Sequence, residues 1–303
     1  MSAAGGGRRR TGRPSRAGDA RQPGRTPRAG DAHHPGRAPR PGDARKTAQR
    51  RPRPPVDDRV TVEGRQAVRE LLRARRRRVH EVLVAESAAE SGTLQEILEL
   101  AVTAGVPVRR VGRPQLEARA ATDAPQGVVA SADPLPEASL EQLLRAPAPL
   151  LVVLDGVTDP HNLGAVMRSA LCAGATGLVV GRHRSAAVGP VVTKAAAGAA
   201  EWLPVATVAG VPAALAELRA AGVWTVGLDA GAAGSLWDLA VATEPVALVL
   251  GAEGSGLGRL TRQRCEVVVG VPLQGPLDSL NVSAAATLAC FEVARRRAGA
   301  LPR

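Results

Sequence analysis

The chain has 303 residues, of which 45% are hydrophobic and only 1% are aromatic. So few aromatic side chains argue against a protein that binds single-stranded RNA by stacking bases on aromatic platforms. The net charge of +12 is concentrated in residues 1–58, which hold 15 Lys and Arg against five Asp, whereas the other 245 residues carry +2. Such a basic segment indicates a polyanionic partner, most often a nucleic acid.

Residues 1–58 are of low complexity and repeat with a 12-residue step that places Gly18, Gly30 and Gly42 in register. The repeat offers almost no apolar surface to offset the entropy of ordering the chain. We therefore predict that residues 1–58 form a disordered basic tail.

Helices and strands alternate in residues 59–131, which predicts a small α/β domain. A helix is expected to open at Val62–Glu63, and five further elements are expected at 79–85 (strand), 93–105 (helix), 106–111 (strand), 113–120 (helix) and 126–132 (strand). A basic cluster, Arg73 and Arg75 to Arg78, lies at the end of the first helix. These arginines suit either the negative end of a helix or an RNA contact.

A proline-rich stretch, residues 132–148, is expected to be the linker to a second domain, with a short helix at 139–146. Longer βα units follow in residues 149–303. The run LLVVLDGV at 150–157 is apolar throughout, as expected for a strand buried on both faces of a parallel sheet. Further strands are predicted at 176–181, 204–208, 223–230, 245–254 and 265–273, and helices at 162–175, 188–203, 211–222 and 284–293.

Three strand ends in this second domain are unusually polar or glycine-rich: residues 154–170, 248–257 and 271–283. Ligands of parallel sheets bind beyond the carboxyl ends of the strands. Taken singly, each stretch also suits a helix cap or a turn; Asn162, for example, could cap a helix that begins near Leu163. None matches a dinucleotide-binding GxGxxG motif or a P-loop, so those two site classes are disfavoured.

Two side chains are hard to explain as core or cap residues. Glu253 stands between glycines at a strand end, and Arg168 lies two turns into an otherwise apolar helix, where we expect it to face the same strand ends as Asn162. The stretches DPHNLGAVMRSA, LGAEGSGL and VPLQGPLDSLNVSAAA resemble the three signature motifs of the SpoU family, RNA ribose 2′-O-methyltransferases of the SPOUT class. The resemblance covers residues 150–295 in order and spacing. Residues 59–131 resemble the substrate-binding domain of ribosomal RNA members, with Pro125 where many of those have His.

The resemblance implies a parallel-sheet domain with a deep trefoil knot that binds S-adenosylmethionine through loop backbone. It places the cofactor against Gly251, Glu253, Gly254, Val271, Leu273, Leu280 and Asn281. It implies catalytic roles for Asn162, Arg168, Glu253, Ser279 and Asn281. Because a guanidinium holds its proton firmly, we expect Arg168 to stabilise phosphate and alkoxide charge rather than to act as the base. Asn162 would position Arg168 or the ribose, Glu253 would hold Arg168 or its loop, and Ser279 and Asn281 would bond the hydroxyl or the methyl donor.

Members of the family are homodimers, and the face of the last helix with Val282, Ala285, Leu288, Ala289 and Val293 suits either that interface or the core. The expected reaction is 2′-O-methylation of a guanosine in large-subunit ribosomal RNA. The alternatives are a transfer RNA enzyme, an enzyme that protects ribosomal RNA from an antibiotic, or a non-catalytic ribosome-assembly protein.

The sequence gives no sign of a metal site or a membrane segment. Cys172, Cys265 and Cys290 lie far apart in apolar contexts and have no His at metal-ligand spacing, so we expect buried, reduced thiols. No apolar run reaches the ~18 residues of a membrane helix, and the N-terminus lacks the apolar core of a signal peptide. We therefore expect a cytoplasmic protein.

Overall fold

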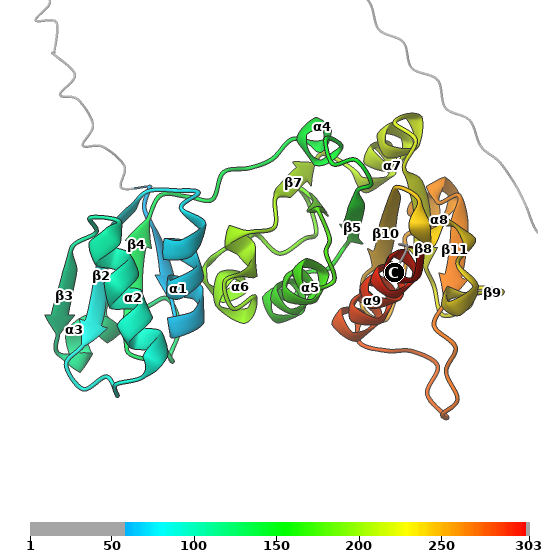
Figure 1. Cartoon of the computed structure of the whole chain (residues 1–303). Coiled ribbons are helices and arrows are strands. Elements are labelled where there is room, and N and C mark those ends of the chain that lie inside the picture. Colours follow the sequence, from blue (N-terminus) through cyan, green and yellow to red (C-terminus); the bar gives the residue numbers. More distant parts are fainter. Residues whose placement is uncertain (1–57, 301–303) are drawn as a thin grey trace, which may run out of the picture. The chain divides into compact units, whose positions relative to one another are not determined.

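The structure, a computed structural model, describes residues 58–300 (Figure 1). The predicted tail, apart from its last residue, lies outside the described residues. The described residues belong to one compact unit.

The first half of the described chain folds into a mixed four-stranded sheet with strand order β1-β4-β2-β3. Its elements are β1 (Val60–Glu63), α1 (Arg65–Ala74), β2 (Val79–Ala85), α2 (Gly92–Thr103), β3 (Val108–Val111), α3 (Arg113–Glu117) and β4 (Val128–Ala132). Strand β4 pairs antiparallel with β1 and β2, while β3 pairs parallel with β2. Because side chains alternate along β2, Val82 and Val84 pack with α1 and α2 while Leu83 and Ala85 pack with α3. The predicted small α/β fold is confirmed.

The helix expected to open at Val62–Glu63 begins later, at Arg65. Val62 and Glu63 belong to strand β1, where they pair with Ala130 and Val129 of β4. Gly64 ends the strand with a φ of 93°, a conformation that favours glycine. The sequence hides this strand because it has four residues and runs directly into the helix.

The second half is built on a seven-stranded sheet with strand order β7-β6-β5-β10-β8-β11-β9, in which every paired strand is parallel. A short helix, α4 (Leu140–Leu143), precedes it. The strands are β5 (Leu150–Asp155), β6 (Gly177–Gly181), β7 (Val205–Val208), β8 (Trp224–Leu228), β9 (Gly234–Ser235), β10 (Val246–Gly251) and β11 (Val267–Gly270). The helices are α5 (Pro160–Cys172), α6 (Pro190–Ala195), α7 (Val211–Ala220), α8 (Arg259–Arg264) and α9 (Val282–Ala300), with 3-10 turns η1 (Ala199–Glu201), η2 (Leu236–Asp238) and η3 (Ala240–Thr243). The parallel sheet is as predicted. The elements α8, β9, η2 and η3 were not predicted.

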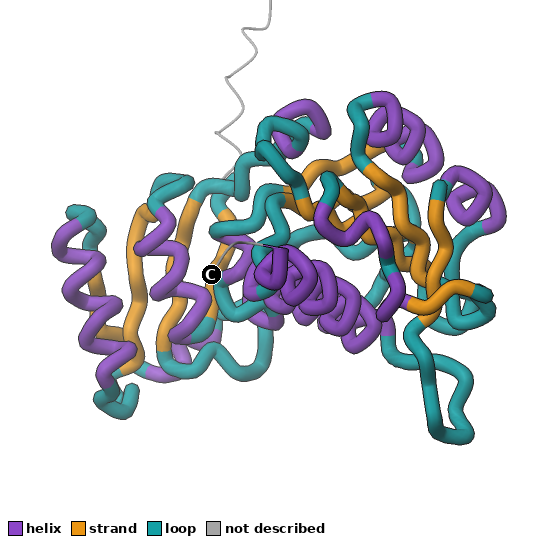
Figure 2. The backbone as a smooth tube through the Cα atoms, turned by 45° about the vertical axis from the view of Figure 1, so that its right-hand side comes forward, coloured by secondary structure: helices purple, strands orange, loops and turns teal. Residues whose placement is uncertain are grey.

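Both faces of this sheet are covered, which explains the apolar run in β5. Val152 and Leu154 pack on the side of α5, α6 and α9, whereas Leu151 and Val153 pack on the side of α4 and α7. The loop between β11 and α9 projects beyond the sheet in both views (Figures 1 and 2). It carries the third sequence motif.

The helix predicted over residues 188–203 is broken. It ends as α6 at Ala195, and the chain continues as the turn η1. Ala197 and Gly198 between them have φ angles of 49° and 89°, which interrupt a right-handed helix. Only glycine fits at position 198, because a Cβ there would lie 2.4 Å from the Cβ of Glu70. The break therefore lets α1 approach this segment closely.

The α1 end of the first sheet is fixed to the second domain by ionic contacts. Arg77 donates to both carboxylate oxygens of Glu201 and, at 2.7 Å, to the carbonyl of Asp133; the side chains of Arg77 and Glu201 are 3% and 0% exposed. Lys194 of α6 pairs with buried Glu63 at 3.2 Å. Arg77 is therefore a structural residue, so the RNA-contact interpretation of the basic cluster is wrong for Arg77.

The final helix is longer than predicted, and most of the face proposed for a dimer is core. Val282, Ala289 and Val293 are buried together with Cys290, whereas Leu288 is exposed. Ala284, Leu288 and Phe291, spaced four and three residues apart, form the exposed apolar stripe of α9 instead.

Candidate active site

The loop after β10 makes a tight turn that only glycines permit. Ala252 and Gly256 exchange backbone hydrogen bonds of 3.1 and 2.9 Å, and this places Glu253 on the turn. Gly254 and Gly256 have φ angles of 77° and 64°. Gly251 has a different constraint, because a Cβ there would lie 2.0 Å from the backbone of Gly256. The strand end is therefore folded back on itself without room for a side chain.

A cavity of about 490 Å³ opens beside this turn, at the carboxyl ends of β8, β10 and β11. All seven residues expected to bind the cofactor line it: Gly251, Glu253, Gly254, Val271, Leu273, Leu280 and Asn281. Ser279 lines it as well. The size is within the range of about 300–1,000 Å³ typical of small-molecule sites.

Three of the predicted catalytic side chains form one hydrogen-bonded cluster. Glu253 Oε1 accepts from Asn162 Nδ2 and from Asn281 Nδ2, both at 2.8 Å, and Asn281 Nδ2 also donates to Asn162 Oδ1 at 3.0 Å. The three residues are separated by 91 and 28 positions in the sequence. This cluster therefore joins the three sequence motifs at a single point.

The side-chain oxygen of Asn281 also accepts hydrogen bonds. Asn281 Oδ1 accepts from the backbone nitrogen of Ser283 at 2.8 Å and from its hydroxyl at 2.6 Å. Asn281 thereby satisfies the first turn of α9 while its other end reaches Glu253. Both polar ends of Asn281 have protein partners, so its position is fixed from two sides.

Asn162 lies inside α5 and does not cap it. The helix begins at Pro160, and Asp159 Oδ1 caps it by accepting from the His161 backbone nitrogen at 2.9 Å. Asn162 is 8% exposed and sits in the first turn, facing the loop of Glu253. The capping interpretation of Asn162 is wrong, and its buried amide serves the cluster instead.

Arg168 does not join the cluster, which corrects two expectations. Six residues separate it from Asn162, and at about 100° per residue this places the two side chains about 120° apart around α5. Arg168 is exposed and makes no hydrogen bond or ion pair within residues 58–300. Neither Asn162 nor Glu253 contacts it; they bind each other and Asn281 instead. The next residue, Ser169, accepts a hydrogen bond from Thr287 of α9 at 2.7 Å.

Ser279 lies on the cavity wall away from the three-residue cluster. Its hydroxyl donates to Asp278 Oδ1 at 3.2 Å, a contact between exposed neighbours. A weak surface bond of this kind leaves the hydroxyl available to a ligand.

Sequence reasoning missed Asp229, which follows β8 and lines the same cavity. Its carboxylate accepts from the Gly231 backbone nitrogen and from Arg262 of α8, both at 2.9 Å. An acidic residue at the carboxyl end of the predicted strand 223–230 was the available signal. With Glu253, it gives the cavity two carboxylates.

The described part of the chain contains no group of three His, Cys, Asp or Glu arranged to hold a metal ion, and no helix long and apolar enough to cross a membrane. The three cysteines are free. Burial raises the pKa of Cys265 to about 11 and that of Cys290 to about 12, which keeps both protonated. Cys172 is exposed, so the expectation that all three thiols are buried is wrong for this one.

Comparison with known proteins covers both domains. Residues 149–291 match the SpoU rRNA Methylase family, and residues 61–138 match the RNA 2′-O ribose methyltransferase substrate binding domain. The chain is 40% identical over 241 residues to a 23S rRNA (guanosine-2′-O-)-methyltransferase RlmB from Pseudomonas putida, covering 78% of this chain and 96% of the relative. It is also 40% identical over 257 residues to an uncharacterized tRNA/rRNA methyltransferase from Mycobacterium marinum, covering 83% of this chain and 82% of the relative.

Among solved structures, the SpoU methyltransferase AviRb from Streptomyces viridochromogenes in complex with the cofactor AdoMet aligns with a TM-score of 0.66 at 27% identity. The alignment covers 80% of this chain and 91% of that one. The near-complete coverage includes the parallel-sheet domain and the substrate-binding domain together. The chain therefore belongs to the SpoU family and is an S-adenosylmethionine-dependent RNA 2′-O-methyltransferase.

Proposed function

We propose that this chain methylates the ribose 2′-hydroxyl of a guanosine in 23S ribosomal RNA. The observation that carries the substrate assignment is that 40% identity to a relative named for this activity extends through both domains and 96% of its length. A ribosomal RNA substrate also supports a cytoplasmic location. The trefoil knot and the domain limits of 59–131 and 149–303 stay predictions.

The cavity beside Glu253 fits S-adenosylmethionine. The missing side chain of Gly251 lets backbone close around a ligand, while Val271, Leu273 and Leu280 supply apolar walls. The carboxylates of Glu253 and Asp229 suit a ligand that carries positive charge. When bound, the cofactor supplies an electrophilic methyl group on a sulfonium.

The cluster geometry assigns Asn162, Glu253 and Asn281 a positioning role in this proposal. Both ends of Asn281 and both polar atoms of Asn162 are engaged with protein groups, so they hold the cofactor loops at fixed positions. Ser279 and Arg168 are free to meet the substrate. Ser279 would bond the ribose hydroxyl or the cofactor, and Arg168 would stabilise the phosphate and the developing alkoxide.

Replacing Arg168 with Ala should abolish methyl transfer and leave cofactor binding intact, because the side chain has no structural partner within residues 58–300. Single-turnover transfer and calorimetric binding of the cofactor measure the two quantities. The matched control is Arg264→Ala, an exposed arginine on α8. Wild-type turnover by Arg168→Ala would remove Arg168 from the mechanism.

The decisive experiment is methyl transfer by the purified chain. Labelled S-adenosylmethionine is supplied with unmodified 23S ribosomal RNA and, separately, with unmodified transfer RNA, and the product is mapped for 2′-O-methylribose. Label at a guanosine of ribosomal RNA is the expected result. Label in transfer RNA alone would support the alternative that the name of the Mycobacterium marinum relative leaves open. Absence of label in both, with no cofactor bound, would favour the non-catalytic assembly protein.

We further propose that the chain works as a homodimer through the exposed stripe of α9. Leu288 and Phe291 are 38% and 46% exposed on a helix whose other face is core. Helix α9 packs beside α5, where Thr287 donates to Ser169. Phe291→Glu should convert a dimer to a monomer in light scattering after gel filtration, with Val102→Glu on α2, also exposed, as the control. A monomeric wild-type chain would reject the dimer.

A further inference from the structure

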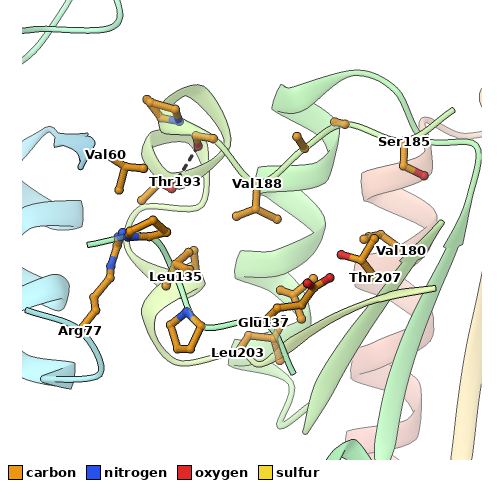
Figure 3. Close-up of a pocket in the computed structure, with 18 of the residues that line it drawn as sticks. Val60, Arg77, Leu135, Glu137, Val180, Ser185, Val188, Thr193, Leu203 and Thr207 are labelled. Carbon is orange, nitrogen blue, oxygen red and sulfur yellow. Dashed lines mark hydrogen bonds between the residues drawn. The ribbon is translucent and has the colours of Figure 1, made fainter. Parts of the chain in front are cut away.

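A second cavity, of about 350 Å³, lies between the substrate-binding domain, the linker and the edge of the methyltransferase sheet. Its walls come from β1, from linker residues 134–137, from loop 185–190 and from strands β6 and β7. Figure 3 shows Val60 and Arg77 at one end of it and Val180, Ser185 and Thr207 at the other. None of the residues placed in the active site lines this cavity.

The second end of this cavity collects polar side chains without partners. The hydroxyl of Ser185 is buried and has no hydrogen-bond partner among the described residues. The half-buried Thr207 and the exposed Glu137 line the same cavity, and their side chains make no hydrogen bond or ion pair within residues 58–300. A buried hydroxyl without a partner is costly to a folded protein, and a ligand that bonded it would recover that cost.

Other lining residues are apolar, and Arg182 adds a cation to the lining. Pro134, Pro136, Val188 and Leu203 supply apolar surface. Arg182 lines the cavity, and it leads the exposed run Arg182, His183 and Arg184, which has no side-chain partner in the described chain. Apolar walls, a polar end and an exposed arginine in the lining suit an extruded nucleobase and its phosphate.

The polar end selects among the bases. A carboxylate accepts from two adjacent donors, and guanine presents N1–H and N2–H₂ side by side, with O6 beside them to accept from a hydroxyl. Adenine presents an acceptor, N1, where the carboxylate would lie. Resting on the proposed function, we propose that this cavity binds an unpaired guanine of the RNA substrate, with Glu137 and the hydroxyls of Ser185 and Thr207 on its edge and Arg182 on its phosphate.

The guanine bound here is not the methylated nucleotide. This cavity lies on β6 and β7, whereas the cofactor cavity lies on β10, β8 and β11. The midpoint between β7 and β6 lies three strand spacings from the midpoint between β10 and β8. At about 4.8 Å per spacing, this distance is about 14 Å. That distance exceeds the span from a ribose 2′-oxygen to the far edge of its own base. The site therefore reads a neighbouring nucleotide and adds specificity beyond the target ribose.

The test is RNA binding by the full chain, measured by filter binding to unmodified 23S ribosomal RNA. Glu137→Gln should lower RNA affinity about tenfold, because an amide cannot accept from both guanine donors. The matched control is Glu141→Gln, the same charge change four residues further on, outside the cavity. On electrostatic grounds alone both variants should bind RNA slightly better, so a loss confined to Glu137→Gln cannot come from charge.

Two further variants keep the test independent of any single substitution. Val188→Phe fills the cavity without a polar change and should weaken RNA binding by a similar factor. Ser185→Ala should weaken RNA binding while leaving thermal stability unchanged or raised, since it removes a hydroxyl without a partner. Unchanged calorimetric affinity for S-adenosylmethionine in all three variants shows that they are folded.

RNA affinities of all three variants equal to wild type would overturn the proposal. So would binding of free guanosine monophosphate that Val188→Phe abolishes while RNA binding is unaffected, because the cavity would then serve a free nucleotide. The proposed function is tested separately: absence of methyl transfer by the wild-type chain would contradict it. The cavity proposal is read from binding and does not depend on turnover.

Discussion

Gly251 and Gly254 both line the proposed cofactor cavity, but glycine is needed at each for a different physical reason. Gly251 has no space for a Cβ, whereas Gly254 has open space and a positive φ of 77°. Gly251→Ala must displace the backbone of Gly256, so it should abolish cofactor binding. Gly254→Ala costs only about 1–2 kcal/mol, the penalty for a side chain in a left-handed backbone conformation. This variant should therefore keep measurable affinity for S-adenosylmethionine. Isothermal titration with S-adenosylmethionine compares them; equal losses in the two variants would contradict this account.

At the residue scale, the resemblance to the SpoU family predicted the cavity lining well and the contacts between side chains poorly. Val271 and Leu273 were placed by that resemblance, and both line the cavity. The bond between Glu253 and Asn162 spans 91 positions and depends on which loops meet. Of the two expected roles of Glu253, to hold Arg168 or its loop, the structure shows no bond to Arg168. Six positions along α5 turn the Arg168 side chain about 120° away from Asn162.

At the scale of elements, one arginine near the carboxyl end of α9 holds this helix against the sheet. Arg297 donates to the carbonyls of Ala148, Pro149, Ala242 and Glu244 at 2.7–3.2 Å, at the starts of β5 and β10. Burial lowers the pKa of Arg297, a sign of how far its charge is removed from water. This role follows from sheet topology and has no local sequence pattern.

Arg297→Met should lower the free energy of unfolding by about 2–4 kcal/mol, since several carbonyls lose a charged donor at once. Urea denaturation measures the change. Arg264→Met, on the surface of α8, is the control and should stay within about 0.5 kcal/mol of wild type. If Arg297→Met loses no more unfolding free energy than the control, water must replace the hydrogen bonds that Arg297 donates to the carbonyls.

The same helix carries an acid-sensitive contact. Hydrogen bonds from Arg295 and then Arg296 lower the pKa of Glu292 from 4.5 to about 2. Because the folded pKa lies below the unfolded one, the stabilisation is full above about pH 5 and is lost as the pH falls from 4.5 toward 2. The stability difference between wild type and Glu292→Gln should follow that window in denaturation curves. A pH-independent difference would contradict the assignment.

At the scale of the whole molecule, the buried pair of Arg77 and Glu201 determines whether the two domains act as one unit. Removing either partner leaves a buried charge, so Arg77→Met or Glu201→Met should each cost about 3–5 kcal/mol. The double variant removes both charges and should cost less than the sum of the single variants. A double-mutant cycle by thermal or urea denaturation measures the coupling. Strict additivity would mean that the two side chains do not interact in solution.

The basic tail lies outside the described residues, and its contribution is a prediction from charge. Residues 1–58 hold a net +10, so their deletion should flatten the dependence of RNA affinity on salt concentration. The slope of log K against log salt is compared for the full chain, for residues 59–303, and for a chain whose tail is replaced by Gly and Ser. An unchanged slope would make the tail a spacer.

Strand β10 is synthesised after β8, yet it lies between β5 and β8 and pairs with both. A nascent chain that has emerged only as far as β8 therefore has an open gap at the centre of its second sheet. The turn of Glu253 is the direct continuation of β10, and the cluster needs Asn281 in addition. The cluster of Asn162, Glu253 and Asn281 therefore forms only after translation has passed residue 281, and a chain truncated before that residue lacks it.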